Sequence, residues 1–288
     1  MWLKIGAIGL DLSRPQVMGV LNVTADSFSD GGRFLDPEEA LAHADAMVRD
    51  GASIIDVGGE STRPGATGVS VQEELDRVMP IVEAITASHP VAVSVDTSKP
   101  EVMRAALRAG AGMINDIFAF RRDGALQAVS ESDCAICLMH MLGEPGTMQD
   151  SPHYDDVTVD VGRFLTARIE ACNNAGIDAN RIVVDPGFGF GKTDRHNLQL
   201  LAKLGSLQIL GRPLLVGLSR KRTLGNLTNR ASADRLPVSV AAAVLAVERG
   251  ATIVRTHDVA ATVDALAVVA AVRSAGLENN QADGCGDG

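Results

Sequence analysis

Eight short apolar segments alternate with longer amphipathic ones along this chain, and this alternation constrains the possible folds more than any other feature. The apolar segments are rich in β-branched residues and have the length of buried strands, whereas the segments between them repeat apolar residues at helical spacing. The expected strands are residues 17–23, 53–59, 91–96, 112–117, 135–140, 181–187, 213–219 and 252–257. Strands that alternate with helices pair in parallel, so the sequence predicts an α/β fold.

The expected helices carry boundary signals of their own. Segments 36–52 and 70–88 begin with an Asp or Ser cap followed by early glutamates, and glycines recur where the helical patterns end. Eight strand–helix units in 288 residues predict a closed TIM (β/α)8 barrel, a fold that usually takes roughly 250 residues. A doubly wound open sheet is the alternative, although such a sheet usually has fewer strands.

The two ends of the chain lie outside this repeat. Residues 3–13 are expected to form a short N-terminal hairpin that covers the bottom of the barrel. Residues 276–288 are rich in glycine and asparagine and are predicted to be a disordered tail. The chain is therefore expected to contain one domain, residues 1–275.

Net charge and cysteine usage limit the partners and the compartment of this protein. A formal charge of −10 disfavours nucleic acid and anionic membranes as partners. Cys134 and Cys137 have a CxxC spacing, but no second pair or nearby histidines complete a zinc site, so buried free thiols are expected. The sequence shows neither a signal peptide nor an apolar run long enough to span a membrane. A soluble, cytoplasmic protein is the resulting expectation.

Polar side chains gather where the expected strands end. These residues are Asn22, Glu60, Ser61, Thr62, Arg63, Asp96, Asn115, Asp116, His140, Asp185, Ser219, Arg220, Lys221, Arg255, His257 and Asp258. One polar residue at a strand end is usually a helix cap, but capping alone does not explain all eight ends. Because the chemistry of such a barrel lies at the carboxyl ends of its strands, the sequence predicts a ligand site there.

One part of this set suits a flat, donor-rich heterocycle. Asp96, Asn115 and Asp185 end three different strands, and a carboxylate can accept two parallel hydrogen bonds from neighbouring ring N–H groups. Lys221 adds a donor for a ring carbonyl or nitrogen.

A second part suits a phosphate. Arg255, His257, Asn22 and Thr62 supply forked donors, a hydroxyl and a possible metal ligand. The glycine-rich segment 185–192, "DPGFGFGK", lacks the lysine–hydroxyl ending of a phosphate-binding P-loop. Its glycines are expected to let a loop pack closely under the ligand; an ordinary strand–helix turn with two core phenylalanines is the alternative.

Longer motifs occur in a fixed order between residues 15 and 275. The chain reads "MGVLNVTADSFSDGG", "DVGGESTRPGA", "SVDTSKPEV", "INDI", "CLMHM", "DPGFGFGK", "LVGLSRK" and "RTHDV". In this order they resemble the motifs of the dihydropteroate synthases. The resemblance implies a TIM barrel that condenses 6-hydroxymethyl-7,8-dihydropterin diphosphate with para-aminobenzoate, giving 7,8-dihydropteroate and pyrophosphate. This is a step of folate biosynthesis and the target of sulfonamides.

The resemblance also implies roles for single residues. The implied pterin-binding residues are Asp96, Asn115, Ile117, Met139, Asp185, Phe190 and Lys221. The implied diphosphate-binding residues are Asn22, Thr62, Arg255 and His257, with Mg2+ on the diphosphate and Asn22 as its protein ligand.

Two polar segments correspond to loops that close over the substrates in that family. They are residues 24–32 and 61–66, which are compatible with water and contain glycine for hinging. The implied wall of the aminobenzoate pocket is Phe28, Pro64, Phe190, Ser219 and the stem of Lys221. Asp30 and Arg63 match a loop pair that completes the active site, so the implied catalytic residues are Lys221, Asp30 and Arg63.

The chain departs from the family pattern at a few positions. Ala25 stands where proline is common, and Arg222 and Thr223 stand where small residues are usual. These changes bear on loop dynamics and inhibitor sensitivity and leave the expected reaction intact.

The helical pattern 258–275 is apolar on more than one face. This indicates a homodimer, as is common in the family, or a helix fully packed on its own barrel.

Two other functions fit part of the pattern. A pterin-binding methyltransferase with a corrinoid partner would share the carboxylate–amide site but would not need the diphosphate donors. A catalytically silent paralogue would have lost loop or phosphate residues. This chain retains Asn22, Asp30, Arg63, Lys221, Arg255 and His257.

Overall fold

The computed structural model describes residues 1–24, 37–61 and 68–282, with side chains described as far as residue 275. Within these residues, the main sheet has parallel strands in the order β8-β7-β6-β5-β4-β3-β10-β9. A single bridge between Val184 and Leu214 joins the two ends of this order, so the sheet forms a nearly closed barrel. The strands are β3 (Gln16–Asn22), β4 (Ile54–Gly58), β5 (Ala92–Asp96), β6 (Met113–Asp116), β7 (Ala135–Met139), β8 (Ile182–Asp185), β9 (Leu215–Val216) and β10 (Ile253–Thr256). All eight predicted strands are confirmed.

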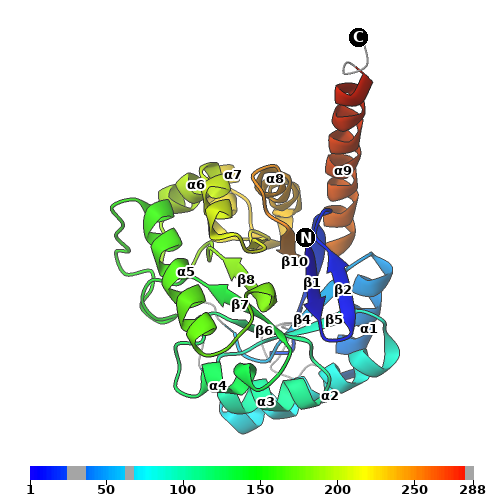
Figure 1. Ribbon diagram of the computed structural model, residues 1–288, viewed down its shortest axis with the longest axis vertical. Helices are drawn as coiled ribbons and strands as arrows, with labels where there is room; N and C mark the ends of the chain where they lie inside the picture. Colours follow the sequence, from blue (N-terminus) through cyan, green and yellow to red (C-terminus); the bar gives the residue numbers. More distant parts are fainter. Residues whose placement is uncertain (25–36, 62–67, 283–288) are drawn as a thin grey trace.

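Helices surround the strands and separate them along the chain (Figure 1). They are α1 (Pro37–Arg49), α2 (Val71–Ser88), α3 (Pro100–Arg108), α4 (Ala125–Ser130), α5 (Val157–Asn174), α6 (Asp194–Ala202), α7 (Arg222–Thr228), α8 (Leu236–Val247) and α9 (Val259–Ala282). The capping signals in the sequence have the expected effect at α2, where Ser70 and Glu73 form a reciprocal capping box.

The N-terminal hairpin closes one end of the barrel. Strands β1 (Trp2–Ile5) and β2 (Ile8–Asp11) pair antiparallel. Their buried side chains join one apolar cluster with residues from all eight barrel strands; the cluster comprises Leu3, Ile5, Leu10, Leu12, Met18, Ile54, Ala92, Met113, Ala135, Cys137, Val183, Leu215 and Ile253. The turn at Gly6 lies so close that a Cβ on Gly112 would be 2.3 Å from the Gly6 nitrogen. The predicted hairpin is confirmed, and it covers the end of the barrel opposite to the predicted ligand site.

Two sequence expectations concern the remaining parts of the chain. Helix α9 continues to Ala282, past residue 275, where the sequence predicts that the domain ends and a disordered tail begins. Cys134, Cys137 and Cys172 are free and buried, as expected for the first two. Among the described residues, no helix combines the length and the apolar character that a membrane span requires.

Candidate active site

The carboxyl ends of the barrel strands surround a cavity of about 520 Å³. Every predicted site residue that the structure describes lines this cavity: Asn22, Asp96, Asn115, Ile117, Met139, Asp185, Phe190, Ser219, Lys221, Arg255 and His257. The remaining predicted residues lie outside the described part of the chain; these are Phe28, Asp30, Thr62, Arg63 and Pro64. The structure therefore brings together side chains that are up to 235 positions apart in the sequence, from Asn22 to His257.

The deep end of the cavity is built on a buried ion-pair network. Arg255 Nε donates to Asp56 Oδ2 at 2.6 Å, and Arg255 Nη2 donates to Asp96 Oδ2 at 3.0 Å. Asn115 Nδ2 also donates to Asp56 Oδ2, at 3.2 Å. The side chain of Asp56 is completely buried, and its Oδ1 has no hydrogen-bond partner among the described residues. Sequence reasoning missed Asp56, although a carboxylate inside an apolar strand is the signal that could have identified it.

Burial raises the pKa of two carboxyl groups at this end of the cavity, Asp96 and Asp185. The pKa of Asp96 is raised to about 7, chiefly because burial disfavours the charged form, with Asp56 adding repulsion and Arg255 opposing the rise. Burial also raises the pKa of Asp185, against the Gly187 N–H that donates to its Oδ1 at 2.7 Å. Although burial disfavours the charged form of Arg255, Asp56 and Asp96 raise its pKa above the usual value. Ring N–H donors of a ligand would stabilise both carboxylates in their charged form.

Lys221 lies over an aromatic wall beside these carboxylates. Its Nζ is 4.3 Å from the centre of the Phe190 ring, a cation–π arrangement. Burial lowers the pKa of Lys221 to about 8, partly offset by Asp185. The ammonium form therefore still predominates at neutral pH and can donate hydrogen bonds to a ligand.

The glycine-rich loop that carries Phe190 is held by side chains from outside it. Lys192 is buried, and its Nζ donates to the carbonyls of Gly187 and Phe190 at 2.9 and 3.1 Å. Gln149 Nε2 donates to the Gly189 carbonyl at 2.6 Å. A Cβ on Gly187, whose φ is +68°, would lie 1.9 Å from the His140 carbonyl oxygen. The close packing expected of these glycines is confirmed, and the loop presents Phe190 in a fixed position.

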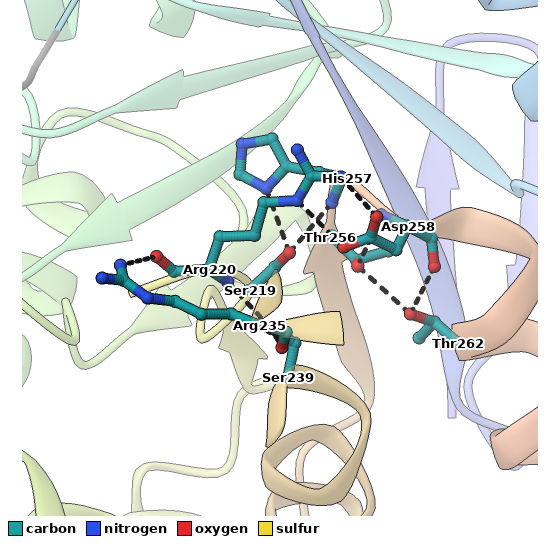
Figure 2. A network of polar contacts seen from close by, with 8 residues as sticks. All are labelled: Ser219, Arg220, Arg235, Ser239, Thr256, His257, Asp258 and Thr262. Carbon is teal, nitrogen blue, oxygen red and sulfur yellow. Dashed lines mark hydrogen bonds and ion pairs between the residues drawn. The ribbon is translucent and has the colours of Figure 1, made fainter. Parts of the chain in front are cut away.

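His257, expected at the diphosphate, lies beside Ser219, expected in the wall of the aminobenzoate pocket (Figure 2). Ser219 Oγ accepts a hydrogen bond from the His257 backbone N–H at 3.2 Å and lies 3.0 Å from His257 Nδ1. Burial, reinforced by Arg255 and Arg220, lowers the pKa of His257 to about 3, so the ring is neutral. The Ser219 hydroxyl can donate to Nδ1; in that tautomer the proton of the neutral ring lies on Nε2, which is then a donor for an anion.

A strained residue joins the last two strand ends. Arg220 has a φ of +57°, a left-handed conformation that is costly for a residue with a Cβ. Its Nε donates to Asp258 Oδ2 at 3.1 Å, and its carbonyl accepts from Arg235 Nη1 at 2.9 Å. Figure 2 shows these contacts beside Ser219 and His257. They hold the segment between Ser219 and Lys221 in place.

A second cluster lies beside the β4 end of the cavity. Lys99 pairs with Glu60, which lines the cavity, and with Glu74 of α2, whose side chain is fully buried. The cluster ties the residues that follow β4 to α2 and to the start of α3. Sequence reasoning found Glu60 as a strand-end residue but gave no signal for its pairing with Lys99, 39 positions away.

The donor set fits a magnesium ion that is bound mainly by a substrate. No group of three or more His, Cys, Asp or Glu side chains that could hold a metal occurs among residues 1–24, 37–61 and 68–282. Asn22 offers one amide oxygen at the cavity wall. Mg2+ in phosphate sites usually keeps several waters and takes one or two protein oxygens, so a single amide ligand is compatible with it.

Comparison with known proteins agrees with this site. A family model described as pterin binding enzyme matches residues 18–257. A curated relative, the dihydropteroate synthase of Escherichia coli strain K12, is 53% identical over 266 residues, which cover 92% of this chain and 94% of that protein. A crystal structure of Yersinia pestis dihydropteroate synthase with a sulfonamide drug complex matches with a TM-score of 0.92 and 53% identity, covering 95% of this chain and 100% of that chain. A structure of Xanthomonas albilineans dihydropteroate synthase with 4-aminobenzoic acid matches with a TM-score of 0.89 and 55% identity, covering 94% and 98%.

Proposed function

This chain belongs to the dihydropteroate synthase family, and we propose which part of its cavity binds each substrate group. The enzyme condenses 6-hydroxymethyl-7,8-dihydropterin diphosphate with para-aminobenzoate, giving 7,8-dihydropteroate and pyrophosphate. In our proposal the pterin lies at the deep carboxylates, the diphosphate at Asn22 and His257, and the aminobenzoate against Phe190. Phe28, Pro64 and Thr62, which lie outside the described residues, complete this assignment as expected from the family.

One observation carries the pterin assignment. Asp96, Asn115, Asp185 and Lys221 come from four different strand ends and line one cavity. A pterin ring presents N–H donors and a carbonyl along one edge, and the two carboxylates and the lysine offer the complementary acceptors and donor. Ile117 and Met139 line the same cavity and supply apolar contact for the ring faces.

The same geometry suits a reaction in which charge develops on both fragments. As the bond between the methylene carbon and the diphosphate oxygen breaks, positive charge spreads over the pterin and negative charge over pyrophosphate. Asp96 and Asp185 stabilise the first, and the Nε2–H of His257 and the Arg255 guanidinium stabilise the second. The amine nitrogen of aminobenzoate then attacks the methylene carbon and loses a proton. An aniline nitrogen needs no strong base before attack, so alignment against Phe190 contributes most.

We propose that Mg2+ accompanies the diphosphate, with Asn22 as its protein ligand. Bound there, the ion would neutralise charge on the leaving pyrophosphate. Asp30 and Arg63 are proposed to complete the catalytic set with Lys221, on the family resemblance alone.

A homodimer is proposed on an apolar groove between α8 and α9. Val244, Ala265, Val268, Val269 and Val272 line it together with Glu248. Val268 and Val272 are 64% and 68% exposed, which is unusual for two neighbouring valines on one helix face. A second copy of the chain is the proposed cover. A monomer mass by light scattering at micromolar concentration would contradict it.

We also propose that the enzyme acts in the cytoplasm and is a target of sulfonamides. The free thiols of Cys134, Cys137 and Cys172 support a reducing compartment. The drug complex of the Yersinia pestis relative supports the proposal that this chain binds sulfonamides.

Pyrophosphate release tests the proposal most simply. The purified chain should release pyrophosphate only when both substrates and Mg2+ are present, and chelation of the metal should stop it. Release with the pterin substrate alone at the same rate would show hydrolysis rather than condensation and would overturn the assignment of the aminobenzoate site.

A further inference from the structure

The aminobenzoate substrate carries a carboxylate that a protein of net charge −10 must bind with a local cation. Among residues 1–24, 37–61 and 68–282, six cationic side chains line the cavity: Lys192, Arg220, Lys221, Arg222, Arg235 and Arg255. A cationic side chain that is already paired with a protein carboxylate or carbonyl binds a second anion less strongly. The partners of each cation therefore indicate which of the six can bind the substrate carboxylate.

Three of the arginines are engaged within the protein. Arg255 pairs with Asp56 and Asp96 and is already assigned to the pyrophosphate in our proposal, and Arg220 pairs with Asp258. Arg235 donates to the carbonyls of Arg220 and Arg230.

The two lysines also have partners within the protein. Lys192 Nζ is buried and has three acceptors within 3.1 Å. Lys221 is already assigned to the pterin in our proposal, and the charge of Asp185 acts on its Nζ, which lies over Phe190. Neither is a ready partner for a carboxylate at the outer end of the cavity.

Arg222 is different. It is exposed to solvent yet lines the cavity, and it has no hydrogen bond or ion pair with any residue in the described part of the chain. The carboxylate whose charge it influences, Asp194, is already bound by neighbours in α7: Thr223 Oγ1 donates to its Oδ1 and Asn226 Nδ2 to its Oδ2, each at 2.7 Å.

The same contacts hold the start of α7, where Arg222 lies. Thr223 Oγ1 also accepts a hydrogen bond from Asn197 Nδ2 at 3.1 Å, so the first turn of α7 is anchored to α6. Thr223 thus occupies the nearby carboxylate and holds the helix, while Arg222 directly beside it keeps its guanidinium available. These are the two positions at which the sequence departs from the small residues usual in the family.

We propose that Arg222 is a specificity-determining residue that binds the carboxylate of the aromatic amine substrate. A guanidinium can bind a carboxylate through two parallel hydrogen bonds, a geometry that an uncharged amide cannot match. The enzyme should therefore prefer an amine with a carboxylate to an isosteric neutral amine, and Arg222 should account for part of that preference. This inference rests on the proposed position of aminobenzoate in the cavity.

The test compares two amines in four proteins. Initial rates of pyrophosphate release are measured with 4-aminobenzoate and with neutral 4-aminobenzamide for the wild type, Arg222→Gln, Arg222→Lys and Arg230→Gln. Arg230 is the matched control, because it is an exposed arginine near the end of α7 that does not line the cavity. Thermal unfolding of each variant checks that the fold is retained.

Arg222→Gln is expected to raise the KM for 4-aminobenzoate about tenfold, the order of one charge-assisted hydrogen bond at a partly exposed site. Its kcat and its KM for 4-aminobenzamide should stay within about twofold of the wild type. Arg222→Lys should recover part of the loss, and Arg230→Gln should change neither amine. The effect of Arg222→Gln should shrink as salt is added, because an exposed ion pair is screened.

Two results would overturn the inference while leaving the proposed function intact. One is an Arg222→Gln enzyme whose KM for 4-aminobenzoate is unchanged. The other is an equal rise in KM for both amines, which would mean that Arg222 shapes the wall of the cavity but does not distinguish a charged substrate from a neutral one. Failure of the proposed function would look different, since the wild type itself would then release no pyrophosphate with 4-aminobenzoate.

Discussion

The two ends of the barrel are built on opposite principles. At the amino-terminal end, Leu3, Ile5, Leu10 and Leu12 of the hairpin pack into one apolar cluster with the strands. At the carboxyl end, the interior holds Asp56, Asp96, Asn115, Asp185 and Arg255. The first arrangement maximises apolar burial, whereas the second keeps charges where their desolvation is costly.

This difference shows which end serves stability and which serves binding. A buried ion pair contributes little net stability, because desolvation offsets much of its attraction. The open end nevertheless contains a carboxylate oxygen with no partner among the described residues, on Asp56, and a left-handed arginine, Arg220. Such costs persist in folded proteins mainly where function requires them.

The largest effect is expected from removing the cation of the deep network. Arg255→Met would leave Asp56 and Asp96 buried without their shared partner. A broken buried pair typically costs about 3–5 kcal/mol, and turnover should be lost as well. Urea unfolding of the variant measures the first effect and pyrophosphate release the second. A variant as stable as the wild type would mean that the network contributes nothing to the folded state.

A slightly smaller effect, confined to stability, is expected at the closed end. Ile5 is 1% exposed in the hairpin cluster, and Ile5→Ala should lower the free energy of unfolding by about 2–4 kcal/mol. The KM values and kcat of the folded enzyme should stay unchanged, because the cluster lies at the opposite end from the cavity. A kcat that falls in proportion to stability would remove the distinction between the two ends.

Lys192 offers a test that is intermediate between Arg255, at the open end, and Ile5, at the closed end. Lys192→Met keeps the length of the side chain but leaves the carbonyls of Gly187 and Phe190 without their donor. Each unsatisfied buried acceptor costs about 1–3 kcal/mol, and Phe190 should lose its fixed position. The KM for aminobenzoate should therefore rise more than the affinity for pterin falls. Equal changes in the KM for aminobenzoate and in pterin affinity would mean that Lys192 stabilises the whole cavity and not the Phe190 loop in particular.

The smallest of these effects is a pH dependence of pterin binding. The pKa of Asp96 is raised to about 7 in the free protein, so the group is protonated below that pH and must lose a proton to accept ring N–H donors. Pterin affinity should therefore rise as pH increases, by about tenfold between pH 6 and pH 8. Calorimetry over this range, with Asp96→Asn as the control that removes the titrating group, measures it. Affinity that falls as pH rises would contradict the assignment.

The fold was predictable from the sequence to an unusual degree because its signals are local. Strand-like segments repeat eight times, helix caps and glycine ends mark several of the helices between them, and the hairpin precedes the first repeat. Strand-end residues such as Asp96, Asn115 and Asp185 could be placed at one cavity because parallel strands put their carboxyl ends on one side.

Pairings across the barrel could not be predicted in this way. Arg255 is expected at the diphosphate, and no sequence pattern indicates that it also contacts Asp56 and Asp96. These two lie on strands that are not adjacent to its own, since β3 lies between β10 and β4. Contacts between strand-end side chains depend on how far each side chain extends across the barrel. No local sequence pattern indicates this. Lys192 and Gln149 were missed for the same reason, because they bind backbone carbonyls rather than other side chains.

The central claim is that the carboxylates of the open end are retained for the pterin and not for the fold, and Asp185→Asn tests it most directly. The asparagine can still accept the hydrogen bond from the Gly187 N–H but carries no charge for the ring. Pterin binding by calorimetry and urea unfolding are measured on the same protein. The account predicts a loss of pterin affinity of about 1–3 kcal/mol with the free energy of unfolding unchanged or raised. Unchanged pterin affinity in a folded variant, or a loss of stability as large as the loss of affinity, would contradict it.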